Sequence, residues 1–309
     1  MRRHRHLLVL VAVLSLAGCR PSPQPPPPRT EPADTSTSSS AAVKSFPVRG
    51  RIVALHGPDV TLDHEAIPGF MDAMTMSYKL KDPGIVSELH PGDRITATLL
   101  VQKDPDGFNN ALLDHIVVIA QARPDYKPAV QYHVPTPGET VPNFAFLNQS
   151  DRTIHLQQFR GRALLMTFVY TRCQLAEFCP RMSHNFADID KALASVPSLY
   201  RQTHLLSISF DPAYDRPAVL RSYGGAYTGR FTQETFSHWD FAAPPLDKLA
   251  EVTQFFNVGV TPGDASSLTH SLSTVLIGKD GKVVAWYPSS DWQTSDVLAQ
   301  LKQAAAATT

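Results

Sequence analysis

The chain has 309 residues, with 28 basic and 28 acidic side chains, so its formal net charge is zero and its sequence pI is near 7.2. This balance gives no support for nucleic-acid binding, which depends on an excess of Lys and Arg. About 265 residues follow the first 45, a length typical of two domains, and there is no internal repeat.

The N-terminus has the pattern of an export signal. A basic start is followed by an apolar run over residues 7–16 and by Ala17-Gly18 before Cys19. The segment Leu-Ala-Gly-Cys resembles the lipobox of bacterial lipoproteins, in which the cysteine becomes the lipid-modified first residue of the mature protein. The resemblance implies a signal peptide over 1–18, lipidation of Cys19 and a stable membrane anchor. We therefore expect a cell-envelope lipoprotein that faces the oxidising periplasm; the sequence leaves open which membrane holds it.

Residues 19–45 are rich in Pro, Ser and Thr and have almost no large apolar side chains. Such a segment cannot bury a core, so we expect a disordered tether.

Residues 46–122 show a short, β-like pattern. Five predicted strands are separated by Gly- and Pro-containing turns and cover residues 49–55, 59–63, 73–80, 93–101 and 112–119. Five short strands without a convincing helix favour a small all-β, OB-like barrel. A second Pro-rich run then predicts a linker over 123–141.

Residues 142–309 alternate between strand and helix patterns. The predicted strands cover 163–170, 204–210, 272–277 and 282–287, and the predicted helices begin at Pro180, near Arg216, near Leu246 and near Ser295. This order of elements is that of an α/β thioredoxin-like fold. We therefore predict two domains, a β-barrel followed by a thioredoxin-like domain.

Cys173 and Cys179 lie directly after the first strand of the second domain, and Pro180 suits the first turn of a helix. We expect the helix N-terminus to stabilise a thiolate at Cys179. A structural disulfide is an alternative, although closing a seven-residue loop stabilises by only roughly 2.4 kcal/mol. A redox couple and a metal site are the other two interpretations.

His270, which precedes the strand at 272–277, distinguishes these interpretations. In a thioredoxin-like topology the loop before this strand returns to the end of the first helix, so His270 can approach both sulfur atoms. Two thiolates and an imidazole form a soft, three-coordinate site suited to Cu(I), and the same ligands can bind Cu(II). Taken alone, one of twelve histidines is more often an ordinary surface residue.

The segments FVYTRC, SISFDPAYDRP and LTHS, followed by LIGKDGKVV, resemble the SCO/SenC family of copper proteins in the same order. The family assists assembly of the copper A centre of cytochrome c oxidase and binds copper with two cysteines and a histidine. The resemblance implies that Cys173, Cys179 and His270 are copper ligands. Asp211 and Asp215 match the family's D-P-x-x-D segment and are candidate supporting residues, with turn or helix capping as the alternative. Five residues separate the cysteines here, where the family usually has three.

The barrel has a cluster of methionines at positions 71, 74 and 76, shortly after His64. Met74 and Met76 have strand spacing and point to one face, as core residues also would. Thioethers suit Cu(I) in an oxidising space, because they need no deprotonation and form no disulfides. The stretch resembles the CusF-like periplasmic copper-binding domain, which has His and two Met ligands, here His64, Met74 and Met76. Met71 stands where that domain has a Trp, so we expect a third thioether or a shield for the ion.

Together these features predict a membrane-anchored copper metallochaperone. The barrel captures Cu(I) and hands it to the thioredoxin-like domain, which delivers it to the copper A subunit of cytochrome c oxidase or to another periplasmic copper protein. Delivery and not catalysis is the expected activity. The alternatives are a thiol–disulfide oxidoreductase that keeps copper-site cysteines reduced, a peroxidase of the peroxiredoxin type, and a copper-buffering or resistance protein.

Overall fold

The computed structural model describes residues 43–104, 107–123, 125–127, 130, 132–262 and 268–307. The predicted signal peptide, Cys19 and most of the predicted tether lie outside these residues. Among the helices of the described ranges, none combines the length and the apolar character needed to cross a membrane.

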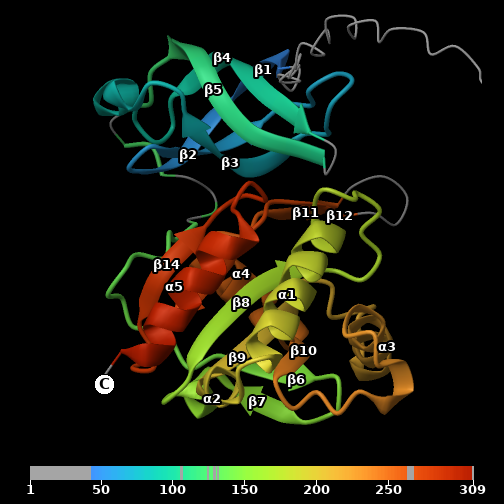
Figure 1. Cartoon of the computed structure of the whole chain (residues 1–309). Coiled ribbons are helices and arrows are strands. Elements are labelled where there is room, and N and C mark those ends of the chain that lie inside the picture. Colours follow the sequence, from blue (N-terminus) through green and yellow to red (C-terminus); the bar gives the residue numbers. More distant parts are fainter. Residues whose placement is uncertain are drawn as a thin grey trace, which may run out of the picture. The chain divides into compact units, whose positions relative to one another are not determined.

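The first part of the described chain is a closed barrel of five strands, in the order β1-β2-β3-β5-β4 (Figure 1). The strands are β1 (Val43–His56), β2 (Asp59–His64), β3 (Met74–Leu80), β4 (Arg94–Asp104) and β5 (Gly107–Ala120). All neighbouring pairs are antiparallel except β3 and β5, which pair in parallel. A 3₁₀ helix, η1 (Pro83–Glu88), connects β3 to β4.

All five predicted strands of the barrel are present, and the observed strands are longer at several ends. Strand β1 begins at Val43, three residues inside the segment that the sequence assigned to the tether, because it pairs with β4 over the full range from Val43 to Arg51. Alternate side chains of β3, which are Met74, Met76, Tyr78 and Leu80, are buried in the barrel core.

The second part is an α/β domain built on a seven-stranded sheet in the order β14-β13-β8-β9-β10-β6-β7. Its strands are β6 (Ala145–Asn148), β7 (Thr153–His155), β8 (Ala163–Val169), β9 (Thr203–Ser209), β10 (Trp239–Ala243), β13 (Thr274–Ile277) and β14 (Val283–Tyr287). The central strands β8, β9 and β10 are parallel, and every residue in them is buried, as the continuous apolar runs predict for β8 and β9. A separate two-stranded sheet is formed by β11 (Val260–Pro262) and β12 (Leu268–His270).

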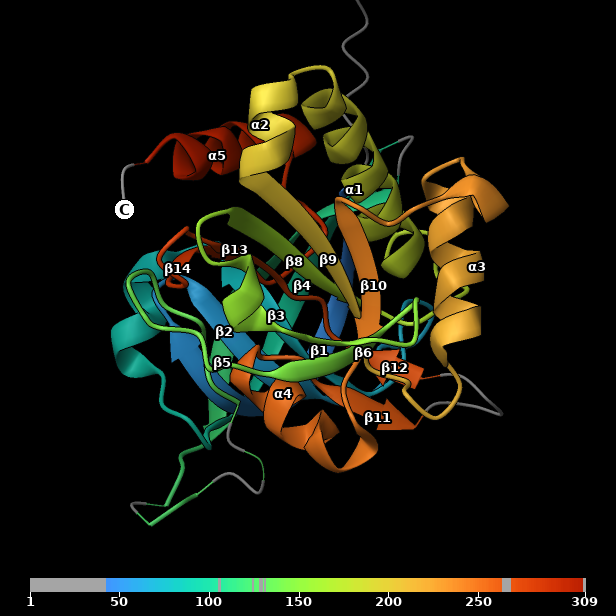
Figure 2. The same ribbon diagram turned by 90° about the horizontal axis from the view of Figure 1, so that it is seen from below.

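Helices cover both faces of this sheet. They are α1 (Cys179–Ala194), α2 (Pro197–Gln202), α3 (Pro217–Tyr227), α4 (Leu249–Phe255) and α5 (Thr294–Ala306), with 3₁₀ helices η2 (Leu156–Phe159), η3 (Phe231–Gln233) and η4 (Leu246–Lys248). Figures 1 and 2 show α1, α2 and α5 on one face of the sheet and α4 on the other. The helix predicted near Leu246 begins as the 3₁₀ helix η4 and continues directly into α4. The two domains keep separate hydrophobic cores.

The elements missing from the sequence prediction are mainly short. Strands β6, β7 and β10 have three to five residues, and α2 has six. Such lengths are too short for a period of 2 or 3.6 to stand out. They are stabilised by neighbours far along the chain, as when β6 pairs with β10.

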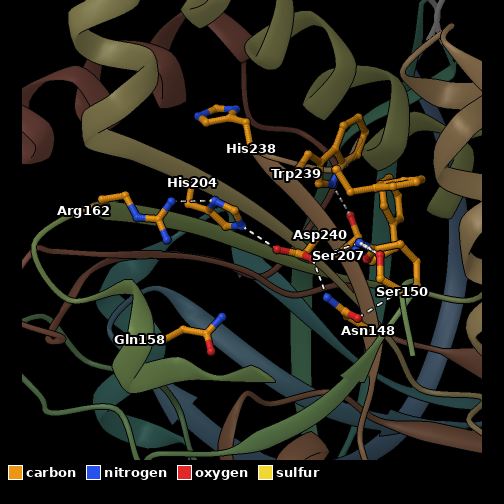
Figure 3. A network of polar contacts seen from close by, with 12 residues as sticks. Asn148, Ser150, Gln158, Arg162, His204, Ser207, His238, Trp239 and Asp240 are labelled. Carbon is orange, nitrogen blue, oxygen red and sulfur yellow. Dashed lines mark hydrogen bonds and ion pairs between the residues drawn. The ribbon is translucent and has the colours of Figure 1, made fainter. Parts of the chain in front are cut away.

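The sheet also encloses a polar network centred on Asp240 (Figure 3). Its carboxylate accepts hydrogen bonds from His204 Nε2 at 2.9 Å, Asn148 Nδ2 at 2.9 Å and Gln149 Nε2 at 3.0 Å. Arg162 donates to Nδ1 of His204 at 3.1 Å. Because a guanidinium can only donate, Nδ1 of His204 is the acceptor, so this imidazole is neutral and its Nε2 carries the proton. The network thus satisfies a buried carboxylate between β6, β9 and β10.

Candidate metal centres

Cys173, Cys179 and His270 converge at one place. Their candidate ligand atoms all lie within 4.8 Å of one another, and within the described residues this is the cluster of His, Cys, Asp or Glu that could hold a metal ion. Nε2 of His270 lies 3.5 Å from the sulfur of Cys179 and 3.8 Å from that of Cys173. Both cysteines are free thiols, and they are neither bridged nor far apart.

The fold positions each of these residues separately. Strand β8 ends at Val169, the chain turns through residues 170–178, and Cys179 is the first residue of α1 with Pro180 next to it. His270 was expected in a loop, but it is the last residue of the short strand β12, where it pairs with Val260 of β11. This pairing fixes the backbone of His270 just before the chain enters β13.

The imidazole of His270 is held in one tautomer. Its Nδ1 lies 2.9 Å from the carbonyl oxygen of Ser271, which can only accept, so Nδ1 carries the proton. The lone pair of Nε2 is consequently free to face the two sulfur atoms. A metal-binding histidine is commonly oriented in this way by a carbonyl behind it.

Aromatic rings surround His270. The rings of Tyr170 and Phe178 meet it edge-on, with centroids 5.5 Å away, and the ring of Phe210 lies at 4.7 Å. His270 itself is almost completely buried. No local pattern marks these three residues, because only the parallel pairing of β8 and β9 brings Phe210 next to Tyr170.

The two thiols differ in acidity. A hydrogen bond from Cys179 holds the pKa of Cys173 well below its ordinary value, despite partial burial. Full burial raises the pKa of Cys179, and the neighbouring sulfur of Cys173 raises it further. The expectation of a thiolate at Cys179 is thus wrong for the metal-free protein, because desolvation at the buried helix start outweighs the favourable helix N-terminus.

Asp215 secures the segment just before Cys173. Its carboxylate accepts hydrogen bonds from the backbone N–H of Thr171 at 3.0 Å, from the Thr171 hydroxyl at 2.5 Å and from the Ser209 hydroxyl at 2.6 Å. Burial raises the pKa of Asp215, against these hydrogen bonds, which lower it. Helix capping fails as an alternative, because the N-cap of α3 is Arg216 and no side chain caps that helix. The turn alternative is correct for the backbone, since the carbonyl oxygen of Asp211 accepts from the N–H groups of Tyr214 and Asp215.

Asp211 acts on the same loop through Arg172. The guanidinium of Arg172 donates to Asp211 at 2.6 Å and stacks over the ring of Tyr214 at 4.1 Å. The two acidic residues therefore connect the segment after β9 to Thr171 and Arg172, the two residues before Cys173. Neither carboxylate belongs to the cysteine–histidine cluster.

The barrel residues form a second candidate site. His64 is the last residue of β2 and lies directly opposite Met74 in the antiparallel pairing of β2 with β3. Met76 follows two residues after Met74 on the same strand. Nδ1 of His64 lies 2.7 Å from the carbonyl oxygen of Glu65 and so carries the proton. The other nitrogen, Nε2, is buried and has no hydrogen-bond partner. A buried lone pair without a partner beside thioethers is the donor arrangement that a soft metal ion would satisfy.

Met71 lies beside this group and is half-buried. Its sulfur accepts a hydrogen bond from the hydroxyl of Tyr78 at 3.5 Å, and the ring of Tyr78 packs against the ring of His64. The side chains of Met71, Met74 and Met76 all line one cavity. The structure thus brings the three predicted thioethers and His64 to the same end of the barrel.

Comparisons with known proteins agree with both parts of the chain. The family model described as SCO1/SenC matches residues 134–306, and the model described as copper binding periplasmic protein CusF matches residues 45–109. A SCO1 protein homolog of Bacillus subtilis (strain 168) is 27% identical over 169 residues, which are 53% of this chain and 82% of that protein.

Two solved structures of similar proteins each match just over half of the chain. The crystal structure of a SCO1/SenC family lipoprotein from Bacillus anthracis is 24% identical, with a TM-score of 0.46, and the match covers 56% of this chain and 99% of that chain. The structure of Bradyrhizobium japonicum ScoI with copper bound is 19% identical, with a TM-score of 0.43, and the match covers 54% and 99%.

Proposed function

The chain belongs to the SCO1/SenC family, and from this we propose that it is a copper-delivery protein of the cell envelope, with Cys173, Cys179 and His270 as ligands. The observation that carries the proposal is the convergence of two sulfur atoms on the unprotonated nitrogen of a buried, oriented imidazole. Sulfur and nitrogen donors in a low-coordinate arrangement favour Cu(I) and also accept Cu(II).

Each residue has a distinct part in binding the cargo ion. The half-exposed Cys173 is the more acidic thiol and makes the first bond to copper. Cys179 loses its proton to solvent as the second Cu–S bond forms, and His270 supplies the third ligand without a proton change. Asp215 and Asp211 hold the loop in the conformation in which the sulfur atoms face His270.

The barrel is proposed to bind a second Cu(I) through His64, Met74 and Met76, with Met71 as a further thioether or a cover. The support is the partnerless buried nitrogen of His64 and the match of residues 45–109 to the CusF model. The proposed recipient is the copper A subunit of cytochrome c oxidase. The proposed anchor is lipidated Cys19, with the signal peptide over 1–18 and a tether over 19–45 that separates both domains from the membrane.

Copper stoichiometry of the reduced mature chain tests the proposal. We expect two Cu(I) per chain, and one in the Cys173→Ser/Cys179→Ser variant. A Met74→Leu/Met76→Leu variant, which keeps the apolar volume, should also bind one. Absence of copper from the reduced wild-type chain would refute the function.

A thiol–disulfide oxidoreductase is the second candidate, because the pair combines an acidic, half-exposed thiol with a buried one. Such an enzyme does not require His270. If the His270→Ala variant keeps both the reduction of an oxidised copper A peptide and the support of oxidase assembly, this candidate is favoured, whereas loss of copper delivery with retained thiol exchange would favour delivery.

A further inference from the structure

Residues of both candidate copper sites line the same cavity. The described residues of the barrel and the α/β domain belong to one compact unit, and within it a cavity of about 990 Å³ is lined by Met71, Met74 and Met76 of the barrel. The same cavity is lined by His270 and by the aromatic residues Tyr170 and Phe178 that surround it. The thioethers of the barrel site and the imidazole of the cysteine–histidine site therefore border one common space.

Direct contacts accompany this arrangement. A Cβ atom at Gly259, which precedes β11, would lie only 2.8 Å from the carbonyl oxygen of Thr75, so β3 approaches the hairpin that carries His270 very closely. Thr75 is the residue between Met74 and Met76. Lys79 of β3 lies 3.3 Å from Asp291, which lines the cavity. The ring of His56 in β1 also meets that of Trp286 in β14 edge-on.

We propose that this cavity is a transfer chamber through which Cu(I) passes from the barrel to Cys173, Cys179 and His270 within one molecule. The inference rests on the proposed function of the two sites. It adds that the ion moves without release to solvent and without a second protein.

The chemistry is ligand exchange at constant oxidation state. Copper–thioether and copper–imidazole bonds to the barrel break as two copper–thiolate bonds and one bond to Nε2 of His270 form. The thiol proton of Cys179 leaves to solvent, and no electron is transferred. Anionic thiolates bind Cu(I) more strongly than neutral thioethers, which gives the transfer its direction.

The experiment uses the full mature chain, with Cys173 and Cys179 oxidised to their disulfide and the barrel loaded with one equivalent of Cu(I). A phosphine reductant starts the reaction in the presence of a Cu(I) chelator, and the thiolate-to-copper absorption band measures arrival at the cysteines. A chain with intact cysteines but Met74→Leu/Met76→Leu, mixed with a loaded Cys173→Ser/Cys179→Ser chain, measures transfer between molecules.

Within one molecule, we expect a rate that does not change with protein concentration and copper that is not diverted to the chelator. A linked site has an effective concentration near 1 mM, so transfer should be about 100-fold faster than between molecules at 10 µM. Copper that appears on the chelator first, or a rate proportional to protein concentration, would overturn the chamber.

Charge variants distinguish transfer through the cavity from transfer between two domains that are only linked by the chain. Lys79→Asp places a second carboxylate beside Asp291 and should slow transfer about fivefold, the factor for the stronger exposed ion pairs. The exchanged pair Lys79→Asp/Asp291→Lys should restore the rate. Lys81→Asp is the matched control, because Lys81 forms its ion pair with Asp114, which belongs to the same barrel domain. Equal rates in all three variants would overturn the chamber.

The loading step distinguishes failure of the barrel site from failure of the transfer chamber. If the oxidised chain does not retain Cu(I), then the barrel site of the proposed function fails, and the chamber fails with it. Retention followed by transfer through solvent overturns the chamber alone.

Discussion

At the scale of single residues, His270 combines three properties that a ligand needs. It is buried, its Nδ1–H donates a hydrogen bond to the carbonyl oxygen of Ser271, and its Nε2 faces both sulfur atoms. The aromatic rings around it prevent rotation away from this position. Its contribution should therefore be to copper binding and not to thiol chemistry.

We expect His270→Ala to weaken Cu(I) binding at the cysteine pair at least about tenfold, since even residues that only orient a ligand contribute 10- to 100-fold to metal affinity. Competition with a chromophoric Cu(I) chelator measures the effect, with the barrel site removed by Met74→Leu/Met76→Leu. His184→Ala, an exposed histidine on α1, is the control. Unchanged affinity would remove His270 from the ligand set.

Asp215 shows how a residue outside the ligand set acts on it. Three donors from Thr171 and Ser209 depend on its carboxylate, and all lie within two residues of Cys173 or at the end of β9. Losing the carboxylate leaves these buried donors without an acceptor.

The Asp215→Ala variant should lose about 1–3 kcal/mol of unfolding free energy, the usual range for buried donors left unsatisfied. Chemical denaturation measures this loss, and Asp188→Ala, an exposed residue on α1, should change it little. The loop also holds Cys173, so the rate of Cys173 alkylation should change in Asp215→Ala only. Wild-type stability with a wild-type alkylation rate would contradict the role of Asp215.

At the scale of elements, the sheet depends on the network around Asp240. Burial raises the pKa of Asp240, but hydrogen bonds from His204, Gln149 and Asn148 outweigh it and hold that pKa below its ordinary value. Burial also lowers the pKa of His204, against the effect of Asp240, which raises it. Both shifts give the α/β domain an acid-sensitive centre.

The direction in which stability changes with pH follows for each group. The unfolded chain protonates His204 near pH 6.5 while the folded chain does not, so stability falls as the pH drops below about 6.5. The lowered pKa of Asp240 contributes stability that is present above the unfolded carboxyl value near 3.9 and is lost as the pH falls through the folded value. Acid should thus act on His204 first.

We expect the unfolding free energy of the α/β domain to decrease between pH 7 and pH 5, by up to about 1.4 kcal/mol per pH unit for one proton. His204→Gln can keep both hydrogen bonds without titrating and should flatten this slope, whereas His184→Gln should not. Denaturation at a series of pH values measures the slopes. Identical slopes in wild type and His204→Gln would contradict the assignment.

At the scale of the whole molecule, two domains with separate cores each carry one candidate site. A ligand that binds only the folded state stabilises it by an amount that grows with its concentration, about 2.7 kcal/mol at 100 times the dissociation constant. Copper therefore reports on each domain separately.

Thermal unfolding of the reduced chain should show that Cu(I) raises the transition of each domain. In Cys173→Ser/Cys179→Ser only the barrel transition should rise, and in Met74→Leu/Met76→Leu only that of the α/β domain. Removing copper with a chelator should return both to their starting values. A shift of the α/β transition in the cysteine variant would mean that copper binds that domain elsewhere.

Much of this architecture is readable from local patterns. Strands β8 and β9 are continuous apolar runs, α1 begins beside Pro180, and the barrel strands are separated by Gly and Pro turns. The candidate ligands are equally visible, because sulfur and imidazole side chains are rare and their spacing along the chain is informative. Short elements such as β6 and β10 are not visible, because pairing with distant strands stabilises them.

Long-range packing set the remaining properties of the sites. Pairing of β13 with β8 brings His270 to Cys179, 91 positions away along the chain, and burial at the helix start makes Cys173 the acidic thiol. The arrangement of Met71, Met74 and Met76 around one cavity with His270 likewise depends on the packing of β3 against the β11–β12 hairpin. Local sequence specifies which donor atoms are present, whereas distances, desolvation and shared cavities arise from contacts between segments that no local pattern connects.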